Sequence, residues 1–199
     1  LGPGSFDYCD GIGFDFSISF VTEPGPVTSF GSGFAAQNPD PGWSYLWNES
    51  GPIGDPSGYR SLVWNGGGYD GEGLPGWPSA DELAYGRVQS WGVHPGRSVN
   101  QGAADDRYVV LRFRIDVGGS YSITDSYLND VGCPSDGVVL MVLVDDAQIM
   151  TVDQAGAAGG SFDVDLGSLA GGSTIDVAIG PGQYDYCDAA SLDYTISRR

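Results

Sequence analysis

Residues 107–128, RYVVLRFRIDVGGSYSITDSYL, form two stretches of mainly β-branched and aromatic residues that a Gly-Gly pair separates. This pattern is typical of two strands joined by a turn. Similar stretches follow at intervals of roughly 10 to 15 residues, with Gly, Asn and Asp between them. The expected strands span 107–117, 120–128, 137–144, 148–152, 161–166, 174–179 and the last residues of the chain. We therefore predict an all-β fold, an antiparallel β-sandwich of the jelly-roll or immunoglobulin-like kind.

The preceding residues, 28–104, have a different composition. They are rich in Gly, Pro, Asn and Trp, and turn signals such as Asn65-Gly66-Gly67-Gly68 interrupt them. Only short strands are expected here, near 61–64 and 87–93. The sandwich domain would then span 28–199, with a loop-rich part over 28–104 and a strand-rich part over 105–199.

The charge limits the classes of partner. The formal net charge is -18, from 22 Asp, 4 Glu, 8 Arg and no Lys. Such a chain cannot bind nucleic acid by neutralising phosphates, so divalent cations, polyols and glycans are better partners. The longest apolar run, Val138 to Val144, has seven residues, which is too short to span a membrane.

Two runs in the second half carry a family resemblance. Residues 108–123, YVVLRFRIDVGGSYSI, and 171–182, GGSTIDVAIGPG, resemble the β-sandwich modules appended to secreted bacterial proteins, including carbohydrate-binding-module-like jelly rolls. The resemblance covers about 90 residues. It implies a sandwich fold, and it makes sugar binding through aromatic platforms or a structural calcium ion an expectation.

The two ends of the chain are similar to each other. Residues 1–19, LGPGSFDYCDGIGFDFSIS, match 179–197, IGPGQYDYCDAASLDYTIS, at ten positions without a gap. The first copy contains a strand pattern of period two, which places Phe14, Phe16, Ile18 and Phe20 on one face. A stiff hinge of Pro24, Gly25 and Pro26 follows it.

Three interpretations of the copy remain open. It is the first strand of its own sandwich, the tail of a preceding tandem module, or a strand donated to a neighbouring subunit. Burial of the four large apolar side chains, at about 1.5–3 kcal/mol each, would be enough for a stable contact between subunits. We favour donation, with a donor-type segment over 1–23 and a hinge over 24–27. The function expected is that of an extracellular structural subunit that assembles with itself into a pilus-like fibril, in the manner of donor-strand-exchange pilins.

The alternative function is that of a secreted carbohydrate-binding module. Aromatic rings suit the apolar faces of sugars, and the loop-rich part contains many of them. The candidate platform consists of Trp43, Tyr45, Trp47, Trp64 and Trp77. The competing interpretation is that these rings fold onto the sandwich. Asn48-Glu49-Ser50 is also an N-glycosylation sequon, so Asn48 is a candidate glycan attachment site.

Acidic residues recur around two of the three cysteines. Asp7, Asp10, Asp185 and Asp188 are candidate ligands for a structural calcium ion, because hard oxygen ligands suit that ion. Cys9, Cys133 and Cys187 have no spacing typical of a metal site, so we expect a disulfide and an oxidising, extracellular compartment. Any signal peptide is expected to have been removed. The sequence does not decide between the three pairings.

Catalysis has little support in the sequence. His94 is the only histidine, and no GxSxG, HExxH or P-loop pattern accompanies it. The acids are numerous, but no spacing singles out a catalytic pair. We therefore predict a protein that is not an enzyme and that needs no cofactor apart from the structural calcium considered above.

Overall fold

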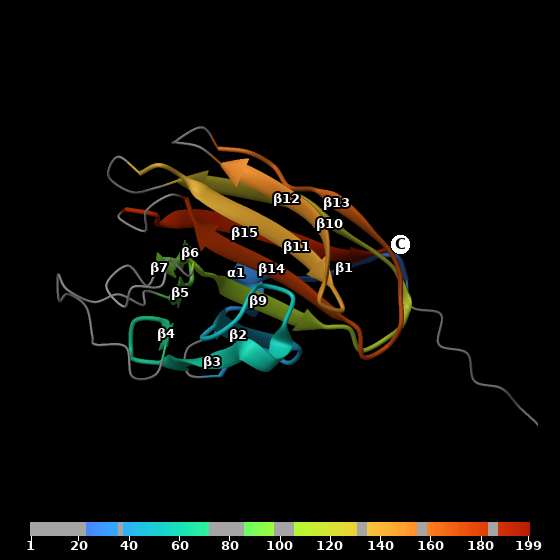
Figure 1. Cartoon of the computed structure of the whole chain (residues 1–199). Helices are drawn as coiled ribbons and strands as arrows, with labels where there is room; N and C mark the ends of the chain where they lie inside the picture. The colour runs from blue at the N-terminus through green and yellow to red at the C-terminus, as the bar shows by residue number, and fades with distance from the viewer. Residues whose placement is uncertain are drawn as a thin grey trace, which may run out of the picture.

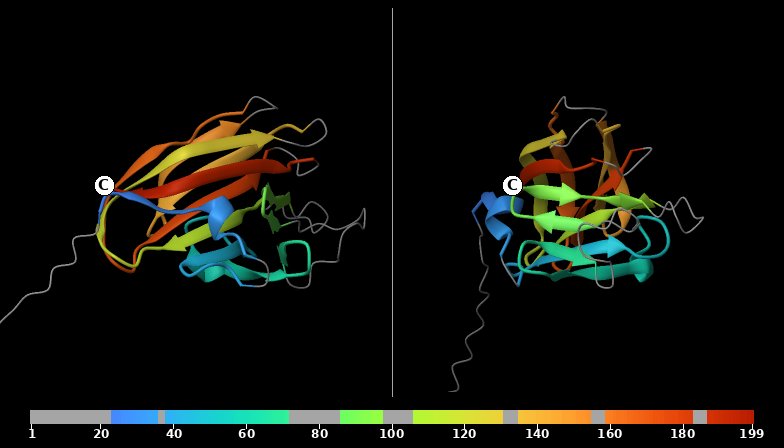
Figure 2. Two further views of the ribbon diagram at one scale, coloured as in Figure 1. Left: turned by 180° about the vertical axis from the view of Figure 1, so that it is seen from behind. Right: turned by 90° about the vertical axis from the view of Figure 1, so that its left-hand side faces the viewer.

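The structure is a computed structural model that describes residues 23–35, 38–71, 86–97, 106–130, 135–154, 159–182 and 187–199. These segments form a two-layered antiparallel β-sandwich, which Figure 1 shows from one side and Figure 2 from behind and end-on. The elements are β1 (Gly25–Ser29), α1 (Phe30–Gly33), β2 (Trp43–Asn48), η1 (Pro56–Gly58), β3 (Tyr59–Trp64), β4 (Tyr69–Gly71), β5 (Arg87–Gln89), β6 (Gly92–His94), β7 (Gly96–Arg97), β8 (Asp106–Arg107), β9 (Val109–Arg114), β10 (Gly119–Asp130), β11 (Val138–Val144), β12 (Ala147–Gln154), β13 (Val164–Leu169), β14 (Thr174–Pro181) and β15 (Ala190–Arg198).

The two layers are joined along one side. The front sheet has the order β12-β11-β14-β9-β2, and the back sheet has the order β13-β10-β15-β6, with β1 also paired to β15. Strand β3 pairs with β2 and with β4, and β4 and β5 continue the pairing to β6. In Figure 1, β12 and β13 therefore lie on the side of the sandwich opposite β3.

The core fills the space between the layers. Val142, Val177, Leu111 and Tyr45 are neighbours across the front sheet and are all buried. Residues that alternate with them along each strand point to the outer face, as the period of two requires. The all-β antiparallel sandwich predicted from the sequence is confirmed.

The C-terminal copy of the repeated segment supplies a central strand of the back sheet. Leu192, Tyr194 and Ile196 of β15 are buried, as their alternation predicts. β15 pairs with β10 along one edge and with β1 and β6 along the other. The N-terminal copy, with Phe14, Phe16, Ile18 and Phe20, lies outside the described residues.

The predicted hinge lies at the start of β1. Gly25 and Pro26 pair with Arg198 and Ser197 of β15. These two hinge residues therefore belong to the sandwich, and Pro24 lies just before the strand.

The largest difference from the sequence prediction is β2. The region 28–104 was expected to consist mainly of long loops, but β2 lies inside the front sheet, between β9 and β3. Its sequence, WSYLWN, alternates between buried aromatic side chains and residues on the outer face. The nearby Pro and Gly residues concealed this strand, because they dominate the local composition.

Candidate functional site

The outer face of the front sheet carries a second, smaller apolar cluster. Val110, Leu143 and Ala178 are buried there, on the side of the sheet away from the main core. The cluster is covered by the β2–β3 loop, residues 49–58, whose Ile53 packs against it. The unbroken apolar run at Val109-Val110-Leu111 fits this arrangement, since a strand buried on both faces loses its alternation.

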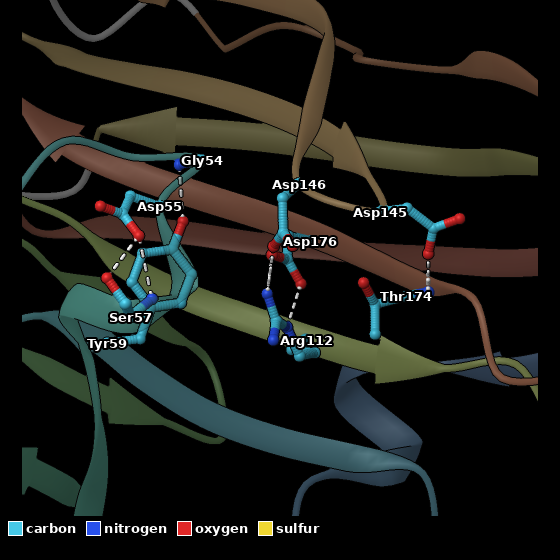
Figure 3. Close-up of polar contacts among 9 residues, drawn as sticks. All are labelled: Gly54, Asp55, Ser57, Tyr59, Arg112, Asp145, Asp146, Thr174 and Asp176. Atoms are coloured by element: carbon cyan, nitrogen blue, oxygen red, sulfur yellow. Dashed lines mark hydrogen bonds and ion pairs between the residues drawn. The ribbon is translucent and has the colours of Figure 1, made fainter.

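Short-range hydrogen bonds shape the covering loop (Figure 3). The Gly54 N–H donates to the Tyr59 hydroxyl at 2.8 Å, and the Ser57 N–H and Oγ donate to Asp55 Oδ1 at 3.1 and 2.6 Å. Gly54 has a φ of +93°, and a Cβ atom at this position would lie 3.0 Å from the Asp146 carbonyl oxygen. The loop therefore has a defined conformation and approaches the β11–β12 turn closely.

An ion-pair network lies next to this loop. Arg112 donates from Nε and Nη2 to the two carboxylate oxygens of Asp176 at 2.8 and 2.7 Å, and from Nη2 to Asp146 at 2.8 Å (Figure 3). The guanidinium Cζ also lies 5.4 Å from the centre of the Tyr59 ring. Asp176 is only 1% exposed. Burial raises the pKa of Asp176, whereas its hydrogen bonds to Arg112 oppose that rise and raise the pKa of Arg112.

The β11–β12 turn holds the other end of this network. Asp145 and Asp146 both have positive φ, at 48° and 66°, as the two central residues of a tight hairpin turn require. The Asp145 carboxylate accepts from the Thr174 N–H at 2.8 Å and from the Ser173 hydroxyl at 3.0 Å. The turn is thereby fixed to the start of β14.

Asn48 anchors the beginning of the loop. Its Nδ2 donates to the carbonyl oxygens of Gly51 and Asp106 at 3.0 and 3.1 Å, and its Oδ1 accepts from the Tyr108 N–H at 2.6 Å. The side chain is buried. Both amide hydrogens are used in these bonds, which gives Asn48 a structural role and disfavours a glycan there; glycosylation of Asn48 stays a prediction.

A hollow of about 510 Å³ opens beside the loop, and we call it the outer-face pocket. Its apolar wall includes Tyr108, whose ring lies over Gly180. A Cβ atom at Gly180 would lie 2.3 Å from two carbons of that ring, so only glycine leaves room for it. The pocket is lined by Asn48, Gly51, Pro52, Ile53, Asp106, Tyr108, Met141 and Gln148.

The lining of the pocket combines the Tyr108 phenol with polar side chains, which include Asp106 and Gln148. Burial raises the pKa of Tyr108 to about 12, and the nearby carboxylates of Asp106 and Asp153 add to the rise. The phenol is therefore neutral at physiological pH and can both donate and accept a hydrogen bond. Gln148 is exposed at the rim, where its amide donates to Thr151 Oγ1 at 2.8 Å.

The aromatic residues predicted to form an exposed platform are placed differently. Trp43, Tyr45 and Trp47 are buried in the main core, because the alternation of β2 directs them inward. The expectation that they form an exposed platform is therefore wrong. Trp64 is half-buried, and Trp77 lies outside the described residues. Three of the rings, Trp43, Tyr45 and Trp64, nevertheless line one smaller hollow together with Tyr69.

Most of the other predicted site residues lie outside the described residues. Asp188 is the exception among the calcium candidates: it is buried, and its Oδ2 accepts from the Gly182 N–H at 3.3 Å. Cys187 has a positive φ of 70°. Calcium binding and the disulfide pairing stay predictions. Those outside the described ranges are Asp7, Asp10, Asp185, Cys9 and Cys133.

Two further observations concern metals and membranes. Among the described residues, no three His, Cys, Asp or Glu side chains are grouped so that they could hold a metal ion. Within the same segments, no helix has the length and apolar character needed to cross a membrane. The lone histidine, His94, lies in β6, where its Nδ1 is 2.6 Å from the Pro95 carbonyl oxygen.

Sequence reasoning missed the residues that form the outer-face pocket. Asp106 and Tyr108 lie at and just after β8, whereas Met141 and Gln148 come from β11 and β12, so the sheet register brings the two parts of the lining together. One signal for the pocket was present in the sequence. Tyr108 precedes the fully apolar run Val109-Val110-Leu111, and a half-buried aromatic ring beside such a run must face outward.

Comparisons with known proteins give structural similarities only. No protein-family model matches the sequence, and neither does any curated protein. An isomalto-dextranase of Arthrobacter globiformis T6, complexed with panose, is similar with a TM-score of 0.34 at 17% identity over 78% of this chain. The present chain spans 23% of that enzyme.

Two smaller proteins are similar over most of their own length. A family 35 carbohydrate-binding module from Clostridium thermocellum has a TM-score of 0.33 and 9% identity, covering 66% of this chain and 87% of the module. A family 35 carbohydrate-binding module from an environmental isolate has a TM-score of 0.33 and 16% identity, covering 77% of this chain and 96% of the module.

Proposed function

We propose that the protein is an extracellular, non-catalytic carbohydrate-binding module that holds a sugar ring in the outer-face pocket. The observation that carries this proposal is the Tyr108 ring, which forms an aromatic wall beside Met141 and Ile53. A sugar ring has an apolar face and a polar edge, and an aromatic wall with polar groups at its rim is complementary to both.

The size and charge of the pocket agree with this class of ligand. Its volume of about 510 Å³ is within the range of small-molecule sites. Asp106 and Gln148 can accept and donate hydrogen bonds to sugar hydroxyls. The net charge of -18 disfavours phosphate-bearing ligands and leaves neutral glycans as the better class.

The same lining argues against hydrolysis. Glycosidases of the usual kind need a pair of carboxyl groups that flank the bond that is cleaved. Asp106 is the only carboxylate in the described lining of the pocket. A bound glycan is therefore expected to be released unchanged.

Affinity electrophoresis in gels that contain neutral polysaccharides tests the proposal, followed by calorimetry with oligosaccharides of the best polysaccharide. Tyr108→Ala is expected to weaken binding strongly, whereas Tyr108→Phe keeps the ring and retains much of it. Tyr127→Ala is the matched control, because Tyr127 is 41% exposed on the back sheet, away from the pocket. Equal binding by the wild type and Tyr108→Ala would contradict the proposal.

A second candidate function is self-assembly by strand addition. The observation that favours it is the outer strand of the front sheet: β12 pairs with β11 alone among the described residues, and its Ile149 is 44% exposed. Neither Pro nor Lys, which commonly protect edge strands, occurs in β12. The apolar alternation of residues 13–20 suits a strand added along this edge.

Light scattering of the full chain and of a chain without residues 1–20 tests this second candidate. Assembly through the strand requires polymers of the full chain that disappear on deletion and on Ile149→Asp substitution. Particles of monomer size in every case would exclude it. Sugar binding by the outer-face pocket is expected to persist after the deletion.

A further inference from the structure

A second hollow lies where strands β2 and β3 separate. Leu46 and Ser61 form the last register pair before this point. Beyond it, β2 pairs with β9 (Tyr45 with Leu111), while β3 pairs with β4 (Trp64 with Tyr69). A hollow of about 330 Å³ opens between the separating strands, and we call it the aromatic slot.

Four of the nine residues that line the slot are aromatic. The centre of the Tyr69 ring lies 4.8 Å from that of Tyr45 and 5.3 Å from that of Trp64. Ser44 and Ser61 also line the slot and are exposed, so the slot combines exposed hydroxyl groups with aromatic surface. It shares no lining residue with the outer-face pocket.

Tyr45 is the unexplained member of this wall. It is 3% exposed, and its hydroxyl has no hydrogen-bond partner among the residues that the structure describes. Its neighbours are satisfied: the Tyr69 hydroxyl donates to the Ala35 carbonyl oxygen, and Trp43 Nε1 donates to Thr28 Oγ1 at 3.1 Å. A buried polar group without a partner is costly, and phenylalanine would fill the same space without that cost.

We infer that the aromatic slot is a second sugar-binding site, in which a neutral sugar ring packs against Trp64 and a ligand hydroxyl completes the hydrogen bonding of Tyr45. This inference rests on the proposed function, because it assigns the same class of ligand to a separate set of residues. Burial raises the pKa of Tyr45, with Tyr69 and Asp40 adding to the rise, so its hydroxyl remains a donor at all physiological pH values.

Two sites on one module change how it binds a polymer. When two sites engage one polysaccharide chain or one surface, the second contact forms at a high effective concentration. The wild type is therefore expected to bind a long neutral polysaccharide more tightly than a short oligosaccharide, by about tenfold to a hundredfold or more.

Isothermal calorimetry with cello-, xylo-, manno- and isomalto-hexaose tests the slot. We expect two binding events per wild-type molecule for at least one of these ligands. Tyr108→Ala is expected to abolish the event at the outer-face pocket and to keep the event at the aromatic slot. Trp64→Ala is expected to do the reverse. Tyr45→Phe weakens only the slot event, by about twofold to tenfold, which is the range for one neutral hydrogen bond.

Thermal unfolding separates a binding role of the Tyr45 hydroxyl from a structural one. Tyr45→Phe is expected to leave the midpoint unchanged or higher. Tyr69→Phe is the matched control, because it removes a hydroxyl that has a partner, and it is expected to lower the midpoint. A lower midpoint for Tyr45→Phe would overturn the inference.

The remaining outcomes are also distinct. A single event that Tyr108→Ala abolishes, and that neither Tyr45→Phe nor Trp64→Ala affects, would overturn the slot and leave the proposed function standing. Failure of the wild type to bind any of the four hexaoses would contradict both proposals.

Discussion

The ring of Tyr108 lies over the backbone of Gly180, in the space that any side chain at position 180 would occupy. An added Cβ atom would be 2.3 Å from Cε1 and Cζ of the ring, well inside van der Waals contact. The neighbouring strand therefore sets the position of the main aromatic group in the outer-face pocket. The orientation of this ring depends on a residue that does not itself line the pocket.

Gly180→Ala is predicted to displace the Tyr108 ring and to reduce sugar binding about as much as Tyr108→Ala does. The added methyl group also overpacks the sheet, which costs about 1–3 kcal/mol of stability. Calorimetry and chemical denaturation measure the two effects. Gly66→Ala is not a suitable control because Gly66 has a positive φ, so Gly67→Ala is preferred, since a Cβ atom there would make only ordinary contacts, the shortest 3.8 Å to Arg87. Normal binding by Gly180→Ala would show that the ring position is unimportant.

Arg112→Ala is predicted to destabilise the fold by about 3–5 kcal/mol, because it leaves the carboxylate of Asp176 buried without its counter-ion. The exposed pair of Arg60 and Glu49, at 2.8 Å, supplies the control. Arg60→Ala is expected to cost about 1 kcal/mol or less, as is usual for surface pairs. Urea denaturation compares the free energies of unfolding of the two variants. Similar losses of stability would mean that the buried pair contributes no more than the exposed one.

Asn48→Ala is predicted to cost about 1–3 kcal/mol, since it leaves the Tyr108 N–H and the two carbonyl groups without their partner. Ser50→Ala removes the glycosylation sequon but leaves Asn48 in place, so it should not change stability, and its mass should differ from that of the wild type only by the hydroxyl oxygen that the substitution removes. Intact-mass measurement after expression in a glycosylating host checks the second part. A mass shift from a glycan at Asn48 would contradict the structure of this loop.

The stability of the protein is predicted to fall as the pH rises from 10 to about 12. Burial raises the folded-state pKa of Tyr108 to about 12, so the unfolded chain loses this proton first, near pH 10. The contribution of Tyr108 is therefore fully present below pH 10 and is lost as the pH approaches 12. Denaturation across this range measures the effect, and Tyr108→Phe should show a shallower decline than the wild type.

Alternation in the sequence was sufficient to predict most of the strand-rich half. The buried residues of β11 and β15 follow the expected period, whereas β14 is buried at every position but its first, and the turns between these strands contain Gly or Asp. The predicted strand at 161–166 is β13 at Val164–Leu169, displaced because Ser126 and Asp163 bind each other and hold the preceding residues outside the ladder.

The candidate sites could not be predicted in the same way. Arg112 and Asp176 are far apart in sequence, and they meet only because β9 and β14 pair in one particular register. The aromatic slot depends on the point at which β2 and β3 separate, and no local pattern specifies that point. The composition indicated that aromatic residues are candidates for sugar binding. It could not distinguish buried rings from accessible ones.

The sharing of β3 between the two layers determines the order in which the sandwich is expected to open. On the β3 side, separation of the layers must break ladder hydrogen bonds, whereas on the side of β12 and β13 it breaks mainly side-chain packing. Local opening therefore begins at β12 and β13, and the strands around the aromatic slot are among the last to come apart. In this way the slot would keep its shape during fluctuations that already expose part of the core.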